Sequence, residues 1–427
     1  TGQVQYPGPT LIVNQGAQVT INLTNQLAEP VSLVFPGQTV TSSTAPFYSY
    51  SSSARNTLRS LAPEAAPGGT QTYTFTADGP GTFYYQSGTN QAIQVRMGLF
   101  GAIIVRPAAA IAIPEVVPAG HNPPTPAKTF TKAAYTPSNA TDDSTVYDRE
   151  YLFLVSEMDP DFHKWVEFDR PQGLLFDLST WRANYWFING RCAPDNMDPA
   201  FTPQLPSQPY TAMTLMHPGE RVLARFINMG SDLHPFHNHG NHMRYVAEDG
   251  QLLQSPGGTG ADLYHEDFTF KLVPGKTADG IFIWTGMNLG WDIYGHQPGD
   301  GMALQPYEWV ADHDRVNTPH EAAVAADSCA TPPCATPTVS QALPTILPTT
   351  QELEPGPWYS GSPFLGSMGS LPPGLGGFNP YNGFFYMWHS HSERELTNFD
   401  IFPGGFLTMM GVIPWPAAGQ PDPIMPE

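Results

Sequence analysis

Residues 221–242 read RVLARFINMGSDLHPFHNHGNH and combine a strand-like pattern with four closely spaced histidines. If RVLARFIN is a β-strand, its side chains point alternately to opposite faces, so Val222, Ala224 and Phe226 share one face. His237 and His239 are also separated by one residue. On a strand, two such imidazoles lie on the same side, about 6–7 Å apart. The stretch therefore predicts β-strands that present histidines in pairs.

Short strand patterns of the same kind recur on both sides of this stretch. Before it they include VTINLT (19–24), TQTYTFT (70–76), GLFGAIIV (98–105) and REYLFLV (149–155). After it come DFTFKLV (267–273), GIFIW (280–284), GFFYMW (383–388) and GFLTMMGVI (405–413). The chain also holds 46 Pro and 40 Gly in 427 residues, which is typical of strands separated by many turns. We therefore expect an all-β protein.

The strand patterns fall into two blocks, which we interpret as two domains. The first is residues 1–107, and the second is residues 149–416. Residues 108–148 are rich in Ala, Pro and Thr without periodicity, so we expect a linker there. The second block loses its pattern over about 295–382, which predicts a long loop-rich insertion. Residues 417–427 form a tail.

Composition excludes several classes of function. A net charge of −20 argues against a nucleic-acid-binding protein, which needs a basic surface. No apolar stretch approaches the length of about 18 residues that a membrane span requires, so we expect none. The chain starts at Thr1 without a basic and apolar leader, which we interpret as a processed, secreted protein. Cys329 and Cys334 are expected to form a local disulfide, with Cys192 unpaired.

The histidines point to a metal site. His389 and His391, in WHSHSERE, form a second HxH pair at the end of a predicted strand. If the two HxH strands lie side by side or face each other, four imidazoles converge on one pocket. Neutral imidazole is the commonest metal ligand in proteins and suits copper and zinc. A purely structural role for these histidines is the alternative interpretation.

These motifs resemble those of the multicopper oxidases. HPFHNHG resembles their HPxHxHG motif, and WHSHSERELTNFDIFPGGFLTMM resembles their C-terminal HCHxxxH segment. In the first block, PGPTLIVNQGAQVTINLTN, GTFYYQSGTNQ and GLFGAIIV resemble further family elements. The resemblance covers about residues 6–107, 149–285 and 383–416. It implies two cupredoxin-like Greek-key β-sandwich domains, copper as cofactor, and the trimeric assembly typical of two-domain members.

Half of the copper ligands that the family pattern implies are missing. The first-domain ligand positions fall at residues 34–37 (VFPG) and 86–88 (QSG), which contain no histidine. Ser390 stands where the blue-copper (type 1) cysteine is expected, and Glu395 stands where a histidine is expected. The position of the axial Met falls near Asp400. The resemblance therefore implies a divergent member without the blue copper centre, and His234 is left as a former ligand.

The remaining metal ligands implied by the resemblance are His237, His239, His389 and His391, with His234 as a weaker candidate. The specific expectation is one copper held by His389, His391 and either His237 or His239. The carboxylates Glu393, Glu395 and Asp400 either orient an imidazole as hydrogen-bond partners or lie in a solvated turn.

We thus expect a secreted copper-binding protein of the multicopper oxidase type, with a residual histidine site in the second domain. One alternative is an active oxidase completed by a partner chain or by insertion histidines, for which His296, His313 and His320 are candidates. Another is a metal-free structural or interaction scaffold. The expected partners are a copper ion and either further copies in a homotrimer or another extracellular protein.

Overall fold

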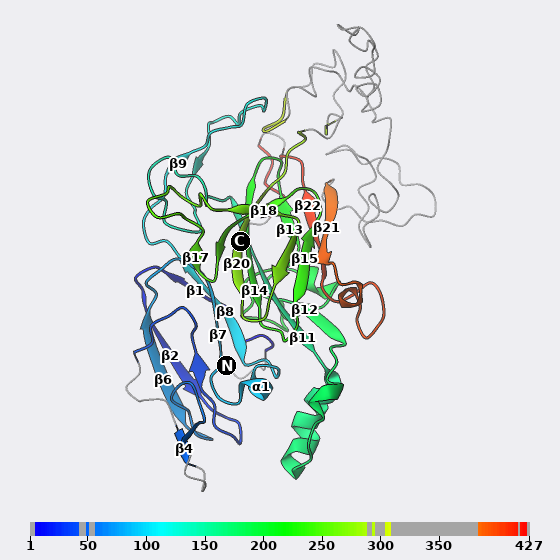
Figure 1. Cartoon of the computed structure of the whole chain (residues 1–427). Coiled ribbons are helices and arrows are strands. Elements are labelled where there is room, and N and C mark those ends of the chain that lie inside the picture. The colour runs from blue at the N-terminus through cyan, green and yellow to red at the C-terminus, as the bar shows by residue number, and fades with distance from the viewer. Residues whose placement is uncertain are drawn as a thin grey trace.

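The computed structural model describes residues 5–41, 48–50, 56–287, 293–294, 304–308, 383–416 and 419–424. Strands dominate this part of the chain, and its helices are short (Figure 1). The α-helices in the described ranges are α1 (Gln91–Gln94) and α2 (Pro160–Lys164). The prediction of an all-β, cupredoxin-like fold is confirmed.

The first group of strands spans the N-terminal quarter of the chain, blue to cyan in Figure 1. A four-stranded sheet has the order β1 (Leu11–Asn14), β8 (Phe100–Arg106), β7 (Gly81–Ser87) and β3 (Leu33–Val34). Two-stranded ladders join β2 (Gln18–Thr24) with β6 (Thr70–Thr76), and β4 (Tyr48–Tyr50) with β5 (Asn56–Leu58). Alternating residues such as Tyr73 and Phe75 fill the core between β6 and the four-stranded sheet.

The second group of strands forms two sheets. One has the order β12 (Tyr185–Ile188), β11 (Arg149–Met158), β14 (Arg221–Asn228), β20 (Thr277–Ile283), β16 (Met243–Glu248) and β17 (Gln251–Leu252), with β18 (His265–Asp267) also paired to β16. The other has the order β13 (Thr214–Met216), β22 (Leu407–Val412), β21 (Phe384–Ser390), β15 (His234–Asn238) and β19 (Thr269–Leu272). Phe153, Phe226, Phe236 and Trp388 pack in the core that both sheets share.

Strand β14 is buried on both faces. Val222, Ala224 and Phe226 point together into the core of the sandwich, as their alternation predicts. On the other face, Ile227 joins a cluster with Phe100 of β8 and other apolar residues of β8 and β11. The first group of strands therefore packs directly against the outer face of the seven-stranded sheet that contains β14.

Residues 108–148 also cover this outer face. They contain the short strands β9 (Ile113–Pro114) and β10 (Thr129–Phe130), which pair with each other. Tyr135 and Tyr147 are buried against Leu223 and Val246 of the seven-stranded sheet. The segment expected to be a linker thus packs along the second group of strands, and the domain boundaries themselves stay predictions.

A helical excursion after β11 has no counterpart in the strand pattern and projects from the body in green in Figure 1. It comprises α2, η1 (Trp165–Asp169), η2 (Arg170–Gln172) and η3 (Leu178–Thr180). The Asp159 carboxylate accepts hydrogen bonds from the backbone N–H groups of Asp161 and Phe162 and so caps α2. Two further short helices are η4 (Asp195–Met197) and η5 (Glu393–Leu396).

Several predictions lie outside the described residues: the Cys329–Cys334 disulfide, His296, His313, His320 and nearly all of the insertion at 295–382. Among the described residues, Cys192 is a free cysteine. Within the same ranges, no helix has the length and apolar character needed to cross a membrane.

Candidate metal centre

Strands β15 and β21 bring the two HxH pairs together. They are antiparallel neighbours, and His237 lies directly opposite His389. The chain leaves β15 after Asn238, and His239 follows at once, with its backbone N–H donating to the carbonyl of Met387 on β21 (3.1 Å). The structure therefore places the two HxH strands side by side.

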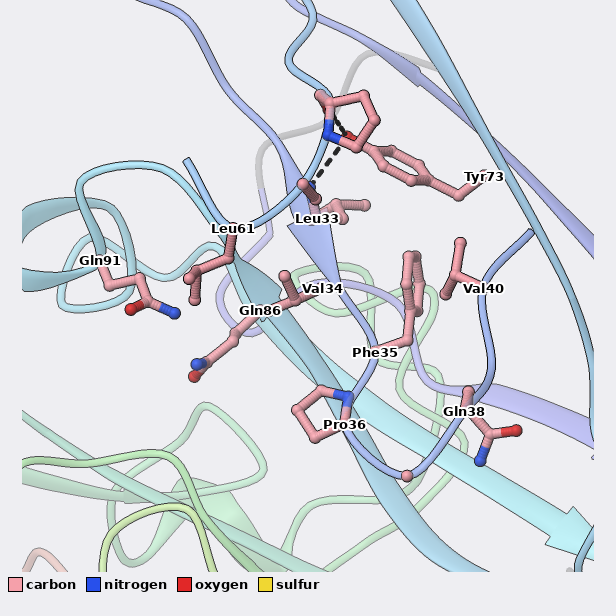
Figure 2. Close-up of a pocket in the computed structure, with 13 residues that line it drawn as sticks. Leu33, Val34, Phe35, Pro36, Gln38, Val40, Leu61, Tyr73, Gln86 and Gln91 are labelled. Atoms are coloured by element: carbon pink, nitrogen blue, oxygen red, sulfur yellow. Dashed lines mark hydrogen bonds between the residues drawn. The ribbon is translucent and has the colours of Figure 1, made fainter. Parts of the chain in front are cut away.

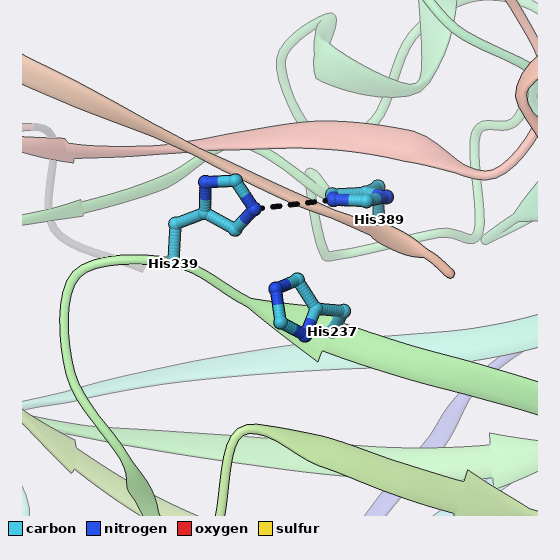
Figure 3. A group of neighbouring side chains, drawn as sticks. All are labelled: His237, His239 and His389. Carbon is cyan, nitrogen blue, oxygen red and sulfur yellow. Dashed lines mark hydrogen bonds between the residues drawn. The ribbon is translucent and has the colours of Figure 1, made fainter. Parts of the chain in front are cut away.

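Three imidazoles form a compact group. One nitrogen from each of His237, His239 and His389 lies within 4.8 Å of the other two. The His239 and His389 Nε2 atoms are 3.3 Å apart, and Figure 3 shows the rings turned toward one another. The ring centroids lie 4.9 to 5.3 Å apart.

His391 lies beside this group on its exposed side. Its ring centroid is 4.8 Å from that of His237 and 5.8 Å from that of His389. Its backbone N–H donates to the carbonyl of Pro235 (2.8 Å), which ties the end of β21 to the start of β15. All four predicted histidines thus occupy one place in the fold, and three of them form the tight set.

The donor set fits a copper ion. Two imidazole nitrogens bound to one ion at about 2.0 Å and a tetrahedral angle lie about 3.3 Å apart, as the Nε2 atoms of His239 and His389 do. His389 Nδ1 lies 2.7 Å from the carbonyl oxygen of Ser390, which only accepts, so Nδ1 carries the proton. The lone pair is then on Nε2, the atom that faces His239. His237 Nδ1 contacts the Thr269 hydroxyl at 2.6 Å, and this contact orients the His237 ring.

The site also favours the neutral form that a ligand needs. Burial, together with the neighbouring imidazoles, lowers the pKa of His389 to about 4. Burial and the positive charge of His239 and His391 also lower the pKa of His237. These imidazoles are therefore unprotonated at neutral pH and offer lone pairs to a cation.

His234 belongs to the other face of β15. Burial alternates along the strand, with His234 and Phe236 in the core and His237 partly open to solvent. Its Nδ1 lies 2.9 Å from Glu395 Oε2 and its Nε2 lies 3.1 Å from Glu157 Oε2. Both ring nitrogens are thus engaged by carboxylates, and the structure does not bring His234 into the group of three.

The other positions named by the family pattern carry no imidazole or thiolate. Ser390 is buried, and its hydroxyl accepts from the backbone N–H of Ser392 (3.1 Å). Asp400 is mostly exposed, with a carboxylate oxygen 3.7 Å from Arg394 Nε. Of the three carboxylates considered, Glu395 is the one that contacts an imidazole, and that imidazole is His234.

In the first group of strands, residues 34–37 and Gln86, which stand at positions of the missing ligands, line a cavity of about 570 Å³. Figure 2 shows Val34, Pro36 and Gln86 at its wall, and Gly37 lines it as well. Leu61 and Gln91 close the same space. These side chains offer apolar surface and amides, which are poor ligands for copper compared with imidazole.

Two functional contacts were not predicted from the sequence. Thr269 and Glu157 lie on strands remote in sequence from the histidines that they contact. Nothing in the sequence marks Thr269 as a contact of a histidine, because threonine is an ordinary residue of a β-strand. Glu157 does give a signal, because it is a carboxylate near the end of the apolar strand β11, where an unpartnered charge would be costly.

Comparison with known proteins adds a sequence relationship. Residues 2–110 match the multicopper oxidase family, whose members bind copper. A region of 106 residues is 38% identical to L-ascorbate oxidase from Cucurbita pepo var. melopepo. This region makes up 24% of this chain and 17% of that protein. The chain therefore matches less than a fifth of the length of this relative.

Two solved structures resemble the chain over most of its length. The Blue Copper Oxidase from Nitrosomonas europaea is 16% identical with a TM-score of 0.47, covering 95% of this chain and 76% of that one. The multicopper oxidase mgLAC is 15% identical with a TM-score of 0.48, covering 97% and 80%. The match of residues 2–110 and the relative found there thus show a similarity of the N-terminal quarter of the chain to the multicopper oxidase family.

Proposed function

We propose that this chain is a copper-binding protein of the multicopper oxidase type whose copper site lies in the second group of strands. The observation that carries the proposal is the convergence of three imidazole nitrogens, from His237, His239 and His389, within 4.8 Å of one another. Imidazole nitrogen suits copper, and a copper ion would supply one-electron redox chemistry at this position.

Each histidine has a separate role in this proposal. His389 and His239 would hold the ion through their facing Nε2 atoms, and His237 would complete the set. His391 is the fourth candidate, because its ring lies beside that of His237. Three or four imidazoles are too few for several close cations, so we expect about one ion per chain.

We also propose that this protein has no blue copper centre. A blue site needs a thiolate bound to copper, and the Ser390 hydroxyl cannot replace it. His234, the other expected ligand, is held between Glu157 and Glu395. Oxidation of a substrate would then need ligands from elsewhere, which is why a partner chain or the insertion remains the alternative source.

We further propose that the protein is secreted and assembles around this site. A net charge of −20 with few charged residues suits a soluble extracellular protein and attracts metal cations. His391 is exposed in the single chain, next to half-buried His237 and His239. A further copy in a homotrimer, or another extracellular protein, would cover this side of the site.

Copper analysis of histidine variants tests the proposal. Wild type, His239→Ala and His389→Ala are loaded with copper, freed of excess metal and compared by elemental analysis and electron paramagnetic resonance. We expect about one ion per chain in wild type and a clear loss in both variants. His242→Ala is the matched control, because His242 is exposed nearby and outside the group of three. Equal copper in all four proteins would mean that these histidines are not ligands.

A further inference from the structure

His234 is held between two carboxylates from distant parts of the chain. Its imidazole has no solvent exposure, while the Glu157 and Glu395 side chains are 1% and 9% exposed. Glu157 ends the apolar part of β11, His234 opens β15, and Glu395 lies in η5 after β21. The triad therefore connects three elements inside the protein.

The contacts of the triad set its proton count. A carboxylate only accepts hydrogen bonds, and a neutral imidazole has a single N–H to donate. Hydrogen bonds at both ring nitrogens of His234 therefore require one proton more than a neutral imidazole brings. Glu157 Oε1 additionally accepts from the backbone N–H groups of Ser231 and Asp232, so the carboxylate acts as an acceptor at both oxygens.

We propose that His234 is a buried imidazolium that joins Glu157 to Glu395 and thereby positions the two strands that carry the histidine centre. The positions that the family resemblance assigns to blue-copper ligands include His234 and Glu395. In this chain hydrogen bonds link these positions without a metal. The positioning effect on copper rests on the proposed function, whereas the charge state of His234 does not.

The surrounding charges agree with this assignment. Burial disfavours the imidazolium, but the hydrogen bonds and negative charges of Glu157 and Glu395 outweigh it and raise the pKa of His234 to about 9. Asp232 adds a third carboxylate, while Arg96 is the cation whose field reaches Asp232. Tyr6 is a further titratable group near Glu157, and burial together with the charge of Glu157 raises the pKa of its phenol.

The triad is coupled to the histidine centre through the backbone. His234 and His237 lie on opposite faces of β15, three residues apart. The His391 N–H donates to the carbonyl of Pro235, the residue directly after His234 (2.8 Å). The Glu395 N–H donates to the Ser392 carbonyl (2.8 Å) in the turn that follows His391. Loss of the Glu395 contact would therefore free the turn that follows His391 from the start of β15 and change the position of the His391 imidazole relative to the others.

Nitrogen-15 NMR of histidine-labelled, copper-free wild type tests the charge state at pH 7. We expect both ring nitrogens of His234 to be protonated, with assignment by loss of the signals in His234→Gln. A single protonated ring nitrogen would overturn the imidazolium. This measurement needs no copper, so it stands even if copper binding fails.

The positioning effect is tested with Glu395→Gln in the full chain. We expect an altered copper resonance spectrum and an affinity lower by about tenfold, while circular dichroism stays that of wild type. Glu393→Gln is the matched control, because Glu393 is an exposed carboxylate in the same turn. A Glu395→Gln protein with wild-type spectrum and affinity would overturn the positioning role. A wild type that binds no copper would instead refute the proposed function.

Discussion

His237 and His389 lie directly opposite each other in the β15–β21 ladder, with ring centroids 5.3 Å apart. Because the strands are antiparallel and residues two apart share a face, His239 and His391 lie on the same face at either side of this pair. His239 is 5.2 Å from His389, and His391 is 4.8 Å from His237, measured between ring centroids. One pairing register thus converts two HxH sequences into one centre.

Thr269→Val should weaken copper binding. The Thr269 hydroxyl contacts His237 Nδ1 at 2.6 Å and orients the ring, while valine keeps the shape and removes the hydrogen bond. We expect copper affinity to fall by about 10–100-fold, the usual effect of losing such a partner. Competition titration against a chelator measures it. An unchanged affinity would mean that His237 is held by packing alone or does not bind copper.

The copper-loaded protein should lack the intense visible absorption of a copper–thiolate bond. Ser390 is buried at the position where the family pattern has cysteine, and Cys192 is the one cysteine within the described ranges. Burial raises the pKa of the Cys192 thiol to about 12, which keeps it from forming a thiolate ligand. A visible spectrum after copper titration decides the point, and a strong blue band would contradict the assignment of Ser390.

Stability should fall at alkaline pH because of His234. Its pKa is about 9 in the folded protein, above the value of about 6.5 for an unfolded chain. Its contribution is therefore complete below about pH 6.5 and is lost as the pH rises through about 9, which amounts to about 3 kcal/mol. Urea unfolding of copper-free wild type and His234→Gln across this range measures it. The same pH dependence in both proteins would refute the prediction.

Arg225→Leu should destabilise the whole fold. The Arg225 guanidinium is fully buried and donates to Glu150 Oε1 (2.7 Å), Asp279 Oδ1 (3.3 Å) and Thr82 of the first group of strands (2.9 Å). Its removal leaves the buried Asp279 carboxylate without its cation, while Glu150 keeps only Arg106 (2.9 Å), which costs about 3–5 kcal/mol. Arg244→Leu is the control, since Arg244 pairs with Glu266 at the surface and should cost less than about 1 kcal/mol. Equal losses in urea unfolding would be contrary to this account.

Much of the fold follows from local sequence pattern. Alternation in TQTYTFT places Tyr73 and Phe75 in the core, and the same reasoning places Val222, Ala224 and Phe226 in the sandwich. The parallel pairing of β11 with β14 and the burial of Tyr135 and Tyr147 depend on segments far apart in the chain. Periodicity within one segment contains no information on such contacts.

The candidate site was predictable to the same extent. HxH spacing predicts that the imidazoles of each pair share a face, and the resemblance placed the two pairs together. The contacts of Glu157 with His234 and of Thr269 with His237 join strands that no motif links. They follow from the pairing of β19 with β15 and from the packing of β11 against β15 across the two sheets, and were visible only in three dimensions.

X-ray absorption spectroscopy of the copper-loaded wild type tests the central claim most directly. It reports the atoms bound to copper directly in the wild-type protein. The account predicts three or four imidazole nitrogens at about 2.0 Å and no sulfur ligand, with imidazole scattering reduced in His239→Ala. A copper site with a sulfur ligand, or with oxygen ligands and no imidazole, would contradict it.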